Sequence, residues 1–334
     1  LDTQVLKKAV LVASRAPSVH NSQPWRWLAE GERLRLYVDR YRTVPGADHS
    51  GREAIISCGA VFDHLRVTML AAGWRARIER FPNPNDPDHL ATMEFSPVDS
   101  VTDANRLRAE AILQRRTDRL PLGRPTYWDI FEPALRDSLD DSFATLDVLS
   151  DDMRPQLVRA SQLTEALRRD DWSYHTELDW WTSPFVVAEG VPANALASDK
   201  EHLRVDVGRE FPVRSHGNRR PEVEVWSKIL VLSTPHDTRS DVLKCGEALS
   251  TVLLECTVAG MATCTLTHLV ELDESRDIVR SLTAQHGHPQ VVVRAGIAPT
   301  TENLPAPTPR RPVDEVLEIR SLVSGNAVLS DRSG

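Results

Sequence analysis

One segment of this sequence occurs twice. Residues 58–73 read CGAVFDHLRVTMLAAG and residues 245–260 read CGEALSTVLLECTVAG. Four identities recur at an interval of 187: Cys58 and Cys245, Gly59 and Gly246, Ala72 and Ala259, and Gly73 and Gly260. Both segments are apolar nearly all round, as a helix buried on every side is, and both end in the glycine typical of a helix C-terminus. The repeat predicts two diverged copies of one unit, each built on a buried helix. The alternative is two unrelated helices that share residues by chance.

The elements around these helices predict an α+β fold. A short strand precedes each buried helix, at 34–38 and 228–232, and its apolar residues alternate or are β-branched. We expect the buried helices over 52–72 and 244–259. Further helices are expected at 2–15, 103–115 and 273–283, and further strands at 25–29, 75–80, 90–96 and 290–297. We divide the chain into a first half, 1–100, and a second half, 101–334.

Composition limits the class of partner. The 334 residues carry 40 basic and 48 acidic side chains, a net charge of −8, which argues against a nucleic-acid or membrane-surface protein. No segment approaches the ~20 apolar residues that span a bilayer. The four cysteines form no CxxC pair, and reduced thiols in a cytoplasmic protein are the simplest interpretation.

Residues 183–225 show no helical or strand period and contain several prolines and glycines. A compact domain rarely carries so long an irregular segment without a reason. Two interpretations stand equally: a lid over a pocket, or a surface excursion that packs on the protein.

The segment APSVHNSQPWRW, 16–27, has the strongest functional pattern. Pro17 ends the first helix and Pro24 limits regular structure, so the polar side chains between them lie on a constrained loop. Such a loop suits a planar polar ligand. The alternative is a capped helix end with a polar turn, which composition alone favours.

Arginines mark two other segments. In LQRRTDR, 113–119, the side chains of Arg115, Thr117 and Arg119 share one side if the segment is extended. Two guanidinium groups and a hydroxyl match a phosphate dianion; the alternative is a solvated basic helix end. In PTPRRPVDEVL, 307–317, prolines flank Arg310 and Arg311. This segment is either a second phosphate contact or a rigid surface tail.

Together these motifs resemble the nitroreductase family of FMN proteins. APSxxNxQPW after an N-terminal helix, a basic RR[ST]xR element, a buried helix followed by the small-residue loop MATCTLTH (261–268), and a C-terminal RRP tail occur in the family's order. The resemblance implies a nitroreductase-like fold. Family members are usually homodimers that build each FMN site from both subunits.

The distribution of the motifs departs from the family. The first half has the proline-rich loop without the arginine element, and the second half has the arginines without that loop. Each half has therefore lost the complementary part of a site. The chain is most similar to the single-chain Acg-like group of mycobacterial nitroreductase-like proteins. This resemblance implies a fused pseudo-dimer with a lid insertion, one FMN per chain, and function as a monomer.

The resemblance also assigns residues to the cofactor. Arg115, Thr117 and Arg119 would bind the phosphate, helped by Arg310 and Arg311. Pro17, Ser18 and Asn21 would contact the isoalloxazine and ribityl side, and Gln23 would shape that loop. Thr265, Leu266 and Thr267 would offer backbone N–H groups near N5 and O4 of the flavin. No side chain is an obvious acid or base, as expected where the cofactor carries the hydride.

Three functions remain open at this point. The first is an NAD(P)H-dependent FMN oxidoreductase that reduces nitro compounds, quinones or another small aromatic acceptor. The second is a flavin-storage protein with a covered FMN and little or no turnover. The third is a structural or interaction protein without a cofactor. No HExxH, Walker loop, GxGxxG or GxSxG pattern is present, so we expect neither a metal site nor these other chemistries.

Overall fold

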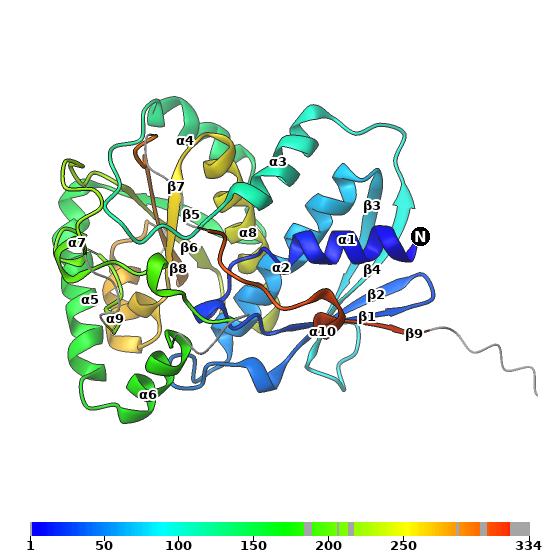
Figure 1. The fold of residues 1–334 in the computed structure, drawn as a ribbon, viewed down its shortest axis with the longest axis horizontal. Helices are drawn as coiled ribbons and strands as arrows, with labels where there is room; N and C mark the ends of the chain where they lie inside the picture. Colours follow the sequence, from blue (N-terminus) through cyan, green and yellow to red (C-terminus); the bar gives the residue numbers. More distant parts are fainter. Residues whose placement is uncertain are drawn as a thin grey trace, which may run out of the picture.

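The computed structural model describes residues 2–183, 189–205, 207–212, 217–284, 287–300 and 306–320. Two long helices, α2 (Arg52–Ala71) and α8 (Arg239–Val258), lie at the centre of the molecule. One β-sheet lies on each side of this helix pair (Figure 1). The largest hydrophobic cluster joins residues of both helices and both sheets, such as Phe62 and Leu253. The two halves of the chain therefore share one core.

The first sheet belongs mainly to the N-terminal part of the chain. Its strands have the order β3-β4-β2-β1-β9. They are β1 (Trp25–Glu30), β2 (Arg33–Val38), β3 (Trp74–Arg80), β4 (His89–Pro97) and β9 (Leu317–Arg320). All neighbours are antiparallel except β1 and β9, which run parallel with Trp27 opposite Leu317. The last described strand of the chain thus pairs with the sheet of its first half.

The second sheet has the order β5-β6-β8-β7, with antiparallel neighbours throughout. Its strands are β5 (Thr145–Leu149), β6 (Lys228–Thr234), β7 (Ala262–Leu266) and β8 (His288–Gly296). In the first sheet, β2 comes just before α2 in the chain and lies between β1 and β4. In the second sheet, β6 comes just before α8 and lies between β5 and β8. The order β3-β4-β2-β1 thus corresponds to β7-β8-β6-β5.

The expected packing of the two buried helices is confirmed at a pair of glycines. A Cβ on Gly59 would lie 2.8 Å from the Cα of Gly246 and 2.2 Å from the carbonyl oxygen of Leu243. A Cβ on Gly246 would lie 2.8 Å from the Cα of Gly59 and 2.2 Å from the carbonyl oxygen of Ile56. One turn further along, the Ser250 hydroxyl donates to Asp63 Oδ2 at 2.6 Å. Residues separated by 187 therefore touch each other along this interface.

Glycines end both central helices, as expected. Gly73 follows α2 with φ +89° and Gly260 follows α8 with φ +76°, the left-handed region that a side chain disfavours. Contrary to expectation, α2 is long and apolar enough to cross a membrane by length and composition, but 78% of its apolar window is buried inside the molecule.

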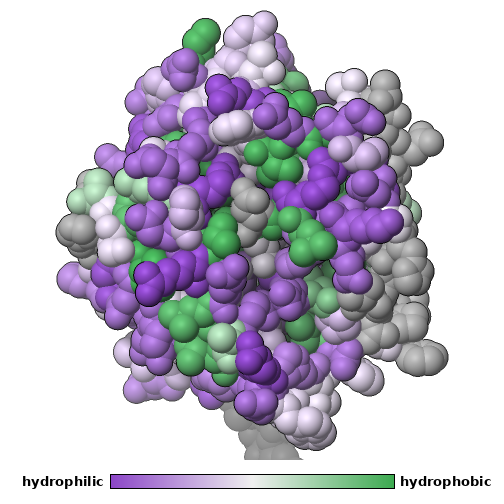
Figure 2. Space-filling view, turned by 90° about the vertical axis from the view of Figure 1, so that its left-hand side faces the viewer, coloured by the Kyte–Doolittle hydropathy of each residue, from purple (hydrophilic) through white to green (hydrophobic). Residues whose placement is uncertain are grey.

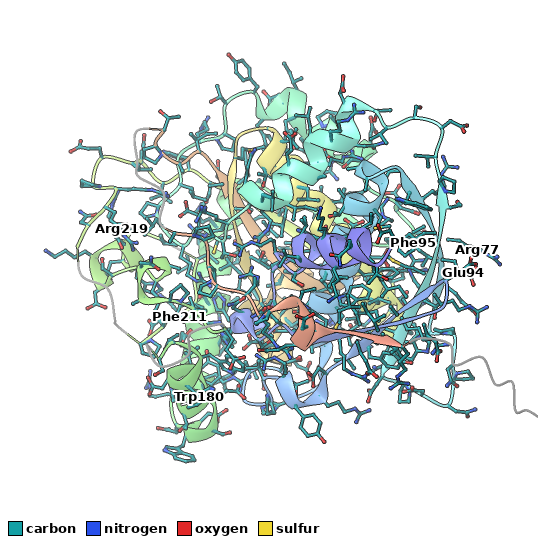
Figure 3. The ribbon with its side chains drawn as sticks, turned by 45° about the vertical axis from the view of Figure 1, so that its right-hand side comes forward. Arg77, Glu94, Phe95, Trp180, Phe211 and Arg219 are labelled. Atoms are coloured by element: carbon teal, nitrogen blue, oxygen red, sulfur yellow. The ribbon has the colours of Figure 1, made fainter. Side chains whose placement is uncertain are left out.

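The other described helices surround this core. They are α1 (Thr3–Ala13), α3 (Asp103–Gln114), α4 (Trp128–Asp137), α5 (Arg154–Arg168), α6 (Trp172–Trp181), α7 (Asp199–His202), α9 (Asp273–Ser281) and α10 (Val313–Val316). In the tandem pair at the end of α6, Trp181 is buried beside Tyr174 and Val44, whereas Trp180 is 59% exposed and points outward (Figure 3). The face on the side of α5 and α7 is mostly hydrophilic, with separate small hydrophobic patches (Figure 2).

The segment at 261–268 contains a strand. The prediction of a loop over 261–268 is wrong for residues 262–266, which form β7 and pair with β8. This strand is short, and its small residues do not show the alternation of apolar side chains that predicts a strand.

Between α6 and β6, the described residues are irregular apart from a 3₁₀ turn at 193–195 and α7. A capping box starts α7, in which Ser198 and Glu201 each accept from the other's backbone N–H. Residues 184–188, 206 and 213–216 of the expected lid lie outside the described part.

Candidate functional site

A cavity of about 390 Å³ lies between the two halves of the chain. The loop 17–20 and the first turns of α2 form one side, and the end of β7 with residues 267–268 forms the other. Residues 197–199, 202–203, 205 and 208–211 cover it. A smaller cavity of about 50 Å³ adjoins the main cavity, and Pro17, Ser18, Thr117 and Arg119 line both. The site is therefore an elongated pocket with a wide and a narrow end.

The loop after α1 is held by its own polar side chains. Its backbone takes positive φ at His20 (47°), Asn21 (58°) and Gln23 (53°). Ser18 Oγ accepts from the backbone N–H of Gln23 at 3.1 Å, and Gln23 Nε2 donates to the backbone oxygen of Asn21 at 3.2 Å. Trp25, fully buried, anchors the start of the following strand. These hydrogen bonds stabilise the positive backbone φ angles, which residues other than glycine seldom adopt.

Asn21 reaches into the narrow end. Its Nδ2 donates to the backbone oxygens of Gly190 at 3.0 Å and Pro309 at 3.1 Å. Its Oδ1 is buried and has no hydrogen-bond partner among the described residues. A buried acceptor without a partner is costly, so a ligand that donates a hydrogen bond here would satisfy it.

Arginines dominate the narrow end. Arg15, Arg115, Arg116, Arg119 and Arg310 line it, and no acidic residue is among its described lining. Arg115 is only 5% exposed. It donates to the backbone oxygen of Arg15 at 3.2 Å, while its Nε has no partner among the described residues. Burial, with the nearby Arg15, lowers the pKa of Arg115 to about 10. Positive charge gathered in this way favours a bound anion.

As expected for an extended segment, Arg115, Thr117 and Arg119 all line the pocket, but Arg116 lines its narrow end as well. Only Asp118 turns away, and it pairs with Arg220 at 2.7 Å. The segment is extended because it forms an isolated parallel bridge with the start of β7, where Asp118 N–H donates to the backbone oxygen of Thr263 at 2.8 Å. Arg119 donates to the backbone oxygen of Ala195 at 3.3 Å, and burial lowers its pKa.

The two arginines of the C-terminal tail differ in their position relative to the pocket. Arg310 lines the narrow end, but its guanidinium donates to the backbone oxygens of Ser14, Arg15, Ala16, Thr308 and Pro309. This side chain ties the tail to the end of α1. Arg311 lies outside the lining of both cavities, and its side chain contacts Glu315. Gln23 is also outside the lining; its Oε1 accepts from the Arg311 backbone N–H at 2.9 Å.

Thr265, Leu266 and Thr267 line the wide end, and the contact of their backbone N–H groups with a flavin stays a prediction. Thr265 and Leu266 are the last residues of β7, where Thr265 pairs with Val293 of β8, and Thr267 follows the strand. Of the predicted residues, ten therefore lie along the pocket: Pro17, Ser18, Asn21, Arg115, Thr117, Arg119, Thr265, Leu266, Thr267 and Arg310.

The side chains of His20, Glu53, Arg209 and Phe211 also line the wide end, although the sequence assigned none of them to the cofactor; of these, only His20 belongs to the polar loop seen in the sequence. His20 is buried, and burial together with Arg209 and Arg119 holds its pKa well below the usual range, so it is neutral. Phe211 contacts His20 edge-on, with ring centroids 6.2 Å apart, and Arg119 lies 5.1 Å from the Phe211 ring. Arg209 and Phe211 lie in the irregular segment, which offers no pattern to place them. Glu53 could have been noticed as an acid at the start of a buried helix.

Polar anchors hold the covering segment on the pocket. Arg209 donates to Tyr174 Oη at 2.8 Å and forms an ion pair with Glu271, whose side chain is 1% exposed. The same arginine donates to Thr267 Oγ1 at 3.2 Å. Within the described residues, no three His, Cys, Asp or Glu side chains gather as a metal site. The pocket therefore fits an elongated organic ligand with an anionic end.

Comparison with known proteins gives the family. No family model matches the chain. An uncharacterized Mycobacterium tuberculosis protein is 65% identical over 334 residues, which cover 98% of this chain and 97% of the relative. A second M. tuberculosis protein, named "Putative NAD(P)H nitroreductase acg", is 55% identical over 320 residues, which cover 96% and 97%.

Among solved structures, the FMN-dependent nitroreductase NfnB of Mycobacterium smegmatis, in complex with NADPH, is similar at 17% identity and a TM-score of 0.37. The match covers 64% of this chain and 93% of that one. The sequence relatives alone decide the assignment, because their identity is high and extends over nearly the whole chain. The chain belongs to the nitroreductase family.

Proposed function

We propose that this protein binds one FMN per chain in the elongated pocket and acts as an NAD(P)H-dependent oxidoreductase of nitro compounds, quinones or similar acceptors. The observation that carries the proposal is the junction of a 390 Å³ cavity with a narrow end lined by five arginines. A flavin ring suits the wide end, and a phosphate dianion suits the arginines. The relative named as an NAD(P)H nitroreductase supports the same chemistry.

Each lining segment has a role in this proposal. Arg115, Thr117 and Arg119 bind the phosphate, and Arg310 holds the wall behind it. Asn21 offers its unpartnered Oδ1 to a donor on the ligand, and Ser18 lies at the junction of the two ends. The bound FMN supplies the hydride chemistry; these residues orient it and exclude water.

We further propose that the chain is a fused pseudo-dimer of two diverged copies, 1–100 and 101–334. The contacts between residues 187 apart and the matching strand orders support this. The place that corresponds to Thr267 in the first half is Arg80. There the Arg80 guanidinium pairs with the buried Glu247 at 2.7 Å and stacks 4.9 Å from the Phe143 ring. A filled core at this position supports one flavin site per chain in place of two.

A second candidate, flavin storage without rapid turnover, is favoured by Phe211. This side chain lines the wide end, where a nicotinamide would have to approach, and Arg209 anchors its segment. We propose that the described part of 189–212 is a lid. Hydride transfer needs the reacting atoms about 3–3.5 Å apart, so a closed lid would prevent it.

The free, buried cysteines fit a cytoplasmic location.

Anaerobic stopped-flow absorbance separates the two candidates. The flavin-loaded protein is mixed with NADPH and, in parallel, with dithionite, which is small. Rapid bleaching by NADPH supports the oxidoreductase. Bleaching by dithionite alone, with NADPH reduction restored in Phe211→Ala, supports the lid and storage. Protein purified without flavin that binds no added FMN would contradict both.

A further inference from the structure

Glu53 is a buried carboxyl between two cavities. It lies in the first turn of α2 and is 2% exposed. Its side chain lines the wide end of the flavin pocket and also a second cavity of about 260 Å³. The second cavity is lined by Asp48, Arg52 and the exposed His49 and Ser50, so it reaches the surface. Glu53 therefore separates the pocket from a route to solvent.

Both carboxyl oxygens of Glu53 lack a hydrogen-bond partner among the described residues. The neighbouring cations are already engaged. Arg52 donates to Gln290 at 2.9 and 3.0 Å and to the backbone oxygen of Val270 at 2.6 Å. Arg209 pairs with Glu271. An ionised carboxylate in this position would be buried and uncompensated.

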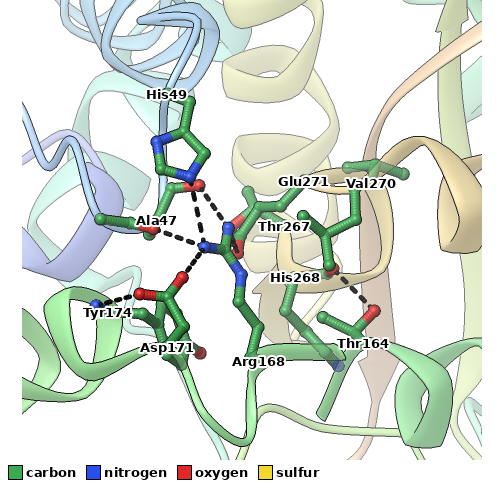
Figure 4. Close-up of polar contacts among 12 residues, drawn as sticks. Ala47, His49, Thr164, Arg168, Asp171, Tyr174, Thr267, His268, Val270 and Glu271 are labelled. Atoms are coloured by element: carbon green, nitrogen blue, oxygen red, sulfur yellow. Dashed lines mark hydrogen bonds and ion pairs between the residues drawn. The ribbon is translucent and has the colours of Figure 1, made fainter. Parts of the chain in front are cut away.

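The charges that face Glu53 come from several elements. Asp48 precedes α2 and accepts from the Ala54 backbone N–H at 2.9 Å. Glu271, before α9, lies between Arg209 and Arg168. Arg168 of α5 also bonds Asp171 and the backbone of the loop at 46–47, beside His49 (Figure 4). Burial, then Glu271 and Asp48, raise the pKa of Glu53 well above its usual value, against the opposing effect of Arg52 and Arg209.

We propose that Glu53 is the proton donor of the flavin pocket, recharged from solvent through the second cavity. This rests on the proposed function. When a quinone bound in the pocket accepts a hydride from reduced FMN, its oxygen must also gain a proton. The Glu53 O–H bond breaks, the proton forms the new O–H bond of the product, and Glu53 becomes a carboxylate. A proton from water in the second cavity then restores the acid.

The first test needs no turnover. A protonated Glu53 binds a proton that the unfolded chain releases above its ordinary pKa of about 4.3, so stability falls as pH rises from there to the folded-state pKa. The folding constant of the wild type should therefore fall relative to Glu53→Gln, by up to tenfold per pH unit, in denaturant titrations from pH 5 upward. A constant ratio across this range would show that Glu53 is ionised and overturn the proposal, whether or not flavin binds.

The second test isolates proton delivery. Protein loaded with FMN and reduced by dithionite is mixed with 1,4-benzoquinone, which needs protons, or with ferricyanide, which accepts electrons alone. Glu53→Gln should slow oxidation by the quinone at least tenfold while changing the ferricyanide rate less than twofold. Equal effects on both oxidants, or no effect on the quinone rate, would overturn the proposal.

Two further variants guard these tests. Glu53→Asp keeps an ionisable group, so its quinone rate should still fall with rising pH; a rate independent of pH would count against the proposal, even if Glu53→Gln does not fold. Glu165→Gln is the matched control. Its carboxyl has a pKa raised mainly by burial, but it lies outside the lining of both cavities. It should react with both oxidants as the wild type does.

Discussion

Arg115 combines the features that a phosphate-binding side chain needs. It is 5% exposed, sits among four other arginines, and keeps its Nε without a partner among the described residues. The guanidinium of Arg310, in the same cavity, instead donates its hydrogen bonds to backbone oxygens. Of the two arginine segments predicted from the sequence, the one with Arg115 therefore holds the proposed phosphate contact, and the one with Arg310 acts as a structural tie.

This difference predicts a selective loss of affinity. Arg115→Ala and Arg119→Ala should each weaken FMN binding by about 1.5–3 kcal/mol, the scale of a hydrogen bond to a charged group. Riboflavin lacks the phosphate, so its weaker binding should hardly change. Fluorescence titration of both ligands measures this. Arg106→Ala, an exposed arginine of the preceding helix paired with Asp103, is the control. Equal losses for riboflavin and FMN would mean that these arginines are structural.

Among elements, the α2–α8 contact depends on two small residues. At Gly59, an alanine Cβ would meet the Leu243 carbonyl oxygen at 2.2 Å, and backbone cannot move aside as a flexible side chain can. Gly59→Ala should lower the free energy of unfolding by about 3 kcal/mol, the upper end for overpacked cores. Urea denaturation measures it through the midpoint at unchanged slope. Gly123→Ala, whose Cβ meets nothing nearer than 3.6 Å, should stay within about 0.5 kcal/mol.

The same element shows how far sequence reasoning reaches. The repeat around Gly59 predicts the helix pair because burial on every side is visible in the residue pattern itself. The loop at 17–23 and the arginines at 115–119 are local patterns too, and the structure brings them into one pocket. Arg209 and Phe211 could not be placed, since their positions depend on an irregular segment held by distant partners such as Glu271.

Across the whole molecule, the pocket draws on both halves of one chain. The loop at 17–20 comes from the first half, and Thr117, Arg119 and residues 265–267 come from the second. The strand β9 ties the end of the second half into the first sheet. In the proposed pseudo-dimer, one chain supplies across the α2–α8 interface the contacts that the family resemblance assigns to two subunits.

The proposed single-chain site predicts flavin binding by the monomer. Extracted flavin should be FMN at a ratio near one per chain, because in the proposed pseudo-dimer Arg80, Glu247 and Phe143 occupy the place that corresponds to the pocket in the other half. Size-exclusion chromatography with light scattering, monitored at the flavin band, should show FMN eluting with the monomer after serial dilution. Loss of flavin on reaching the monomer would place part of the site on a second chain, and a ratio near two would show that the first half keeps a site of its own.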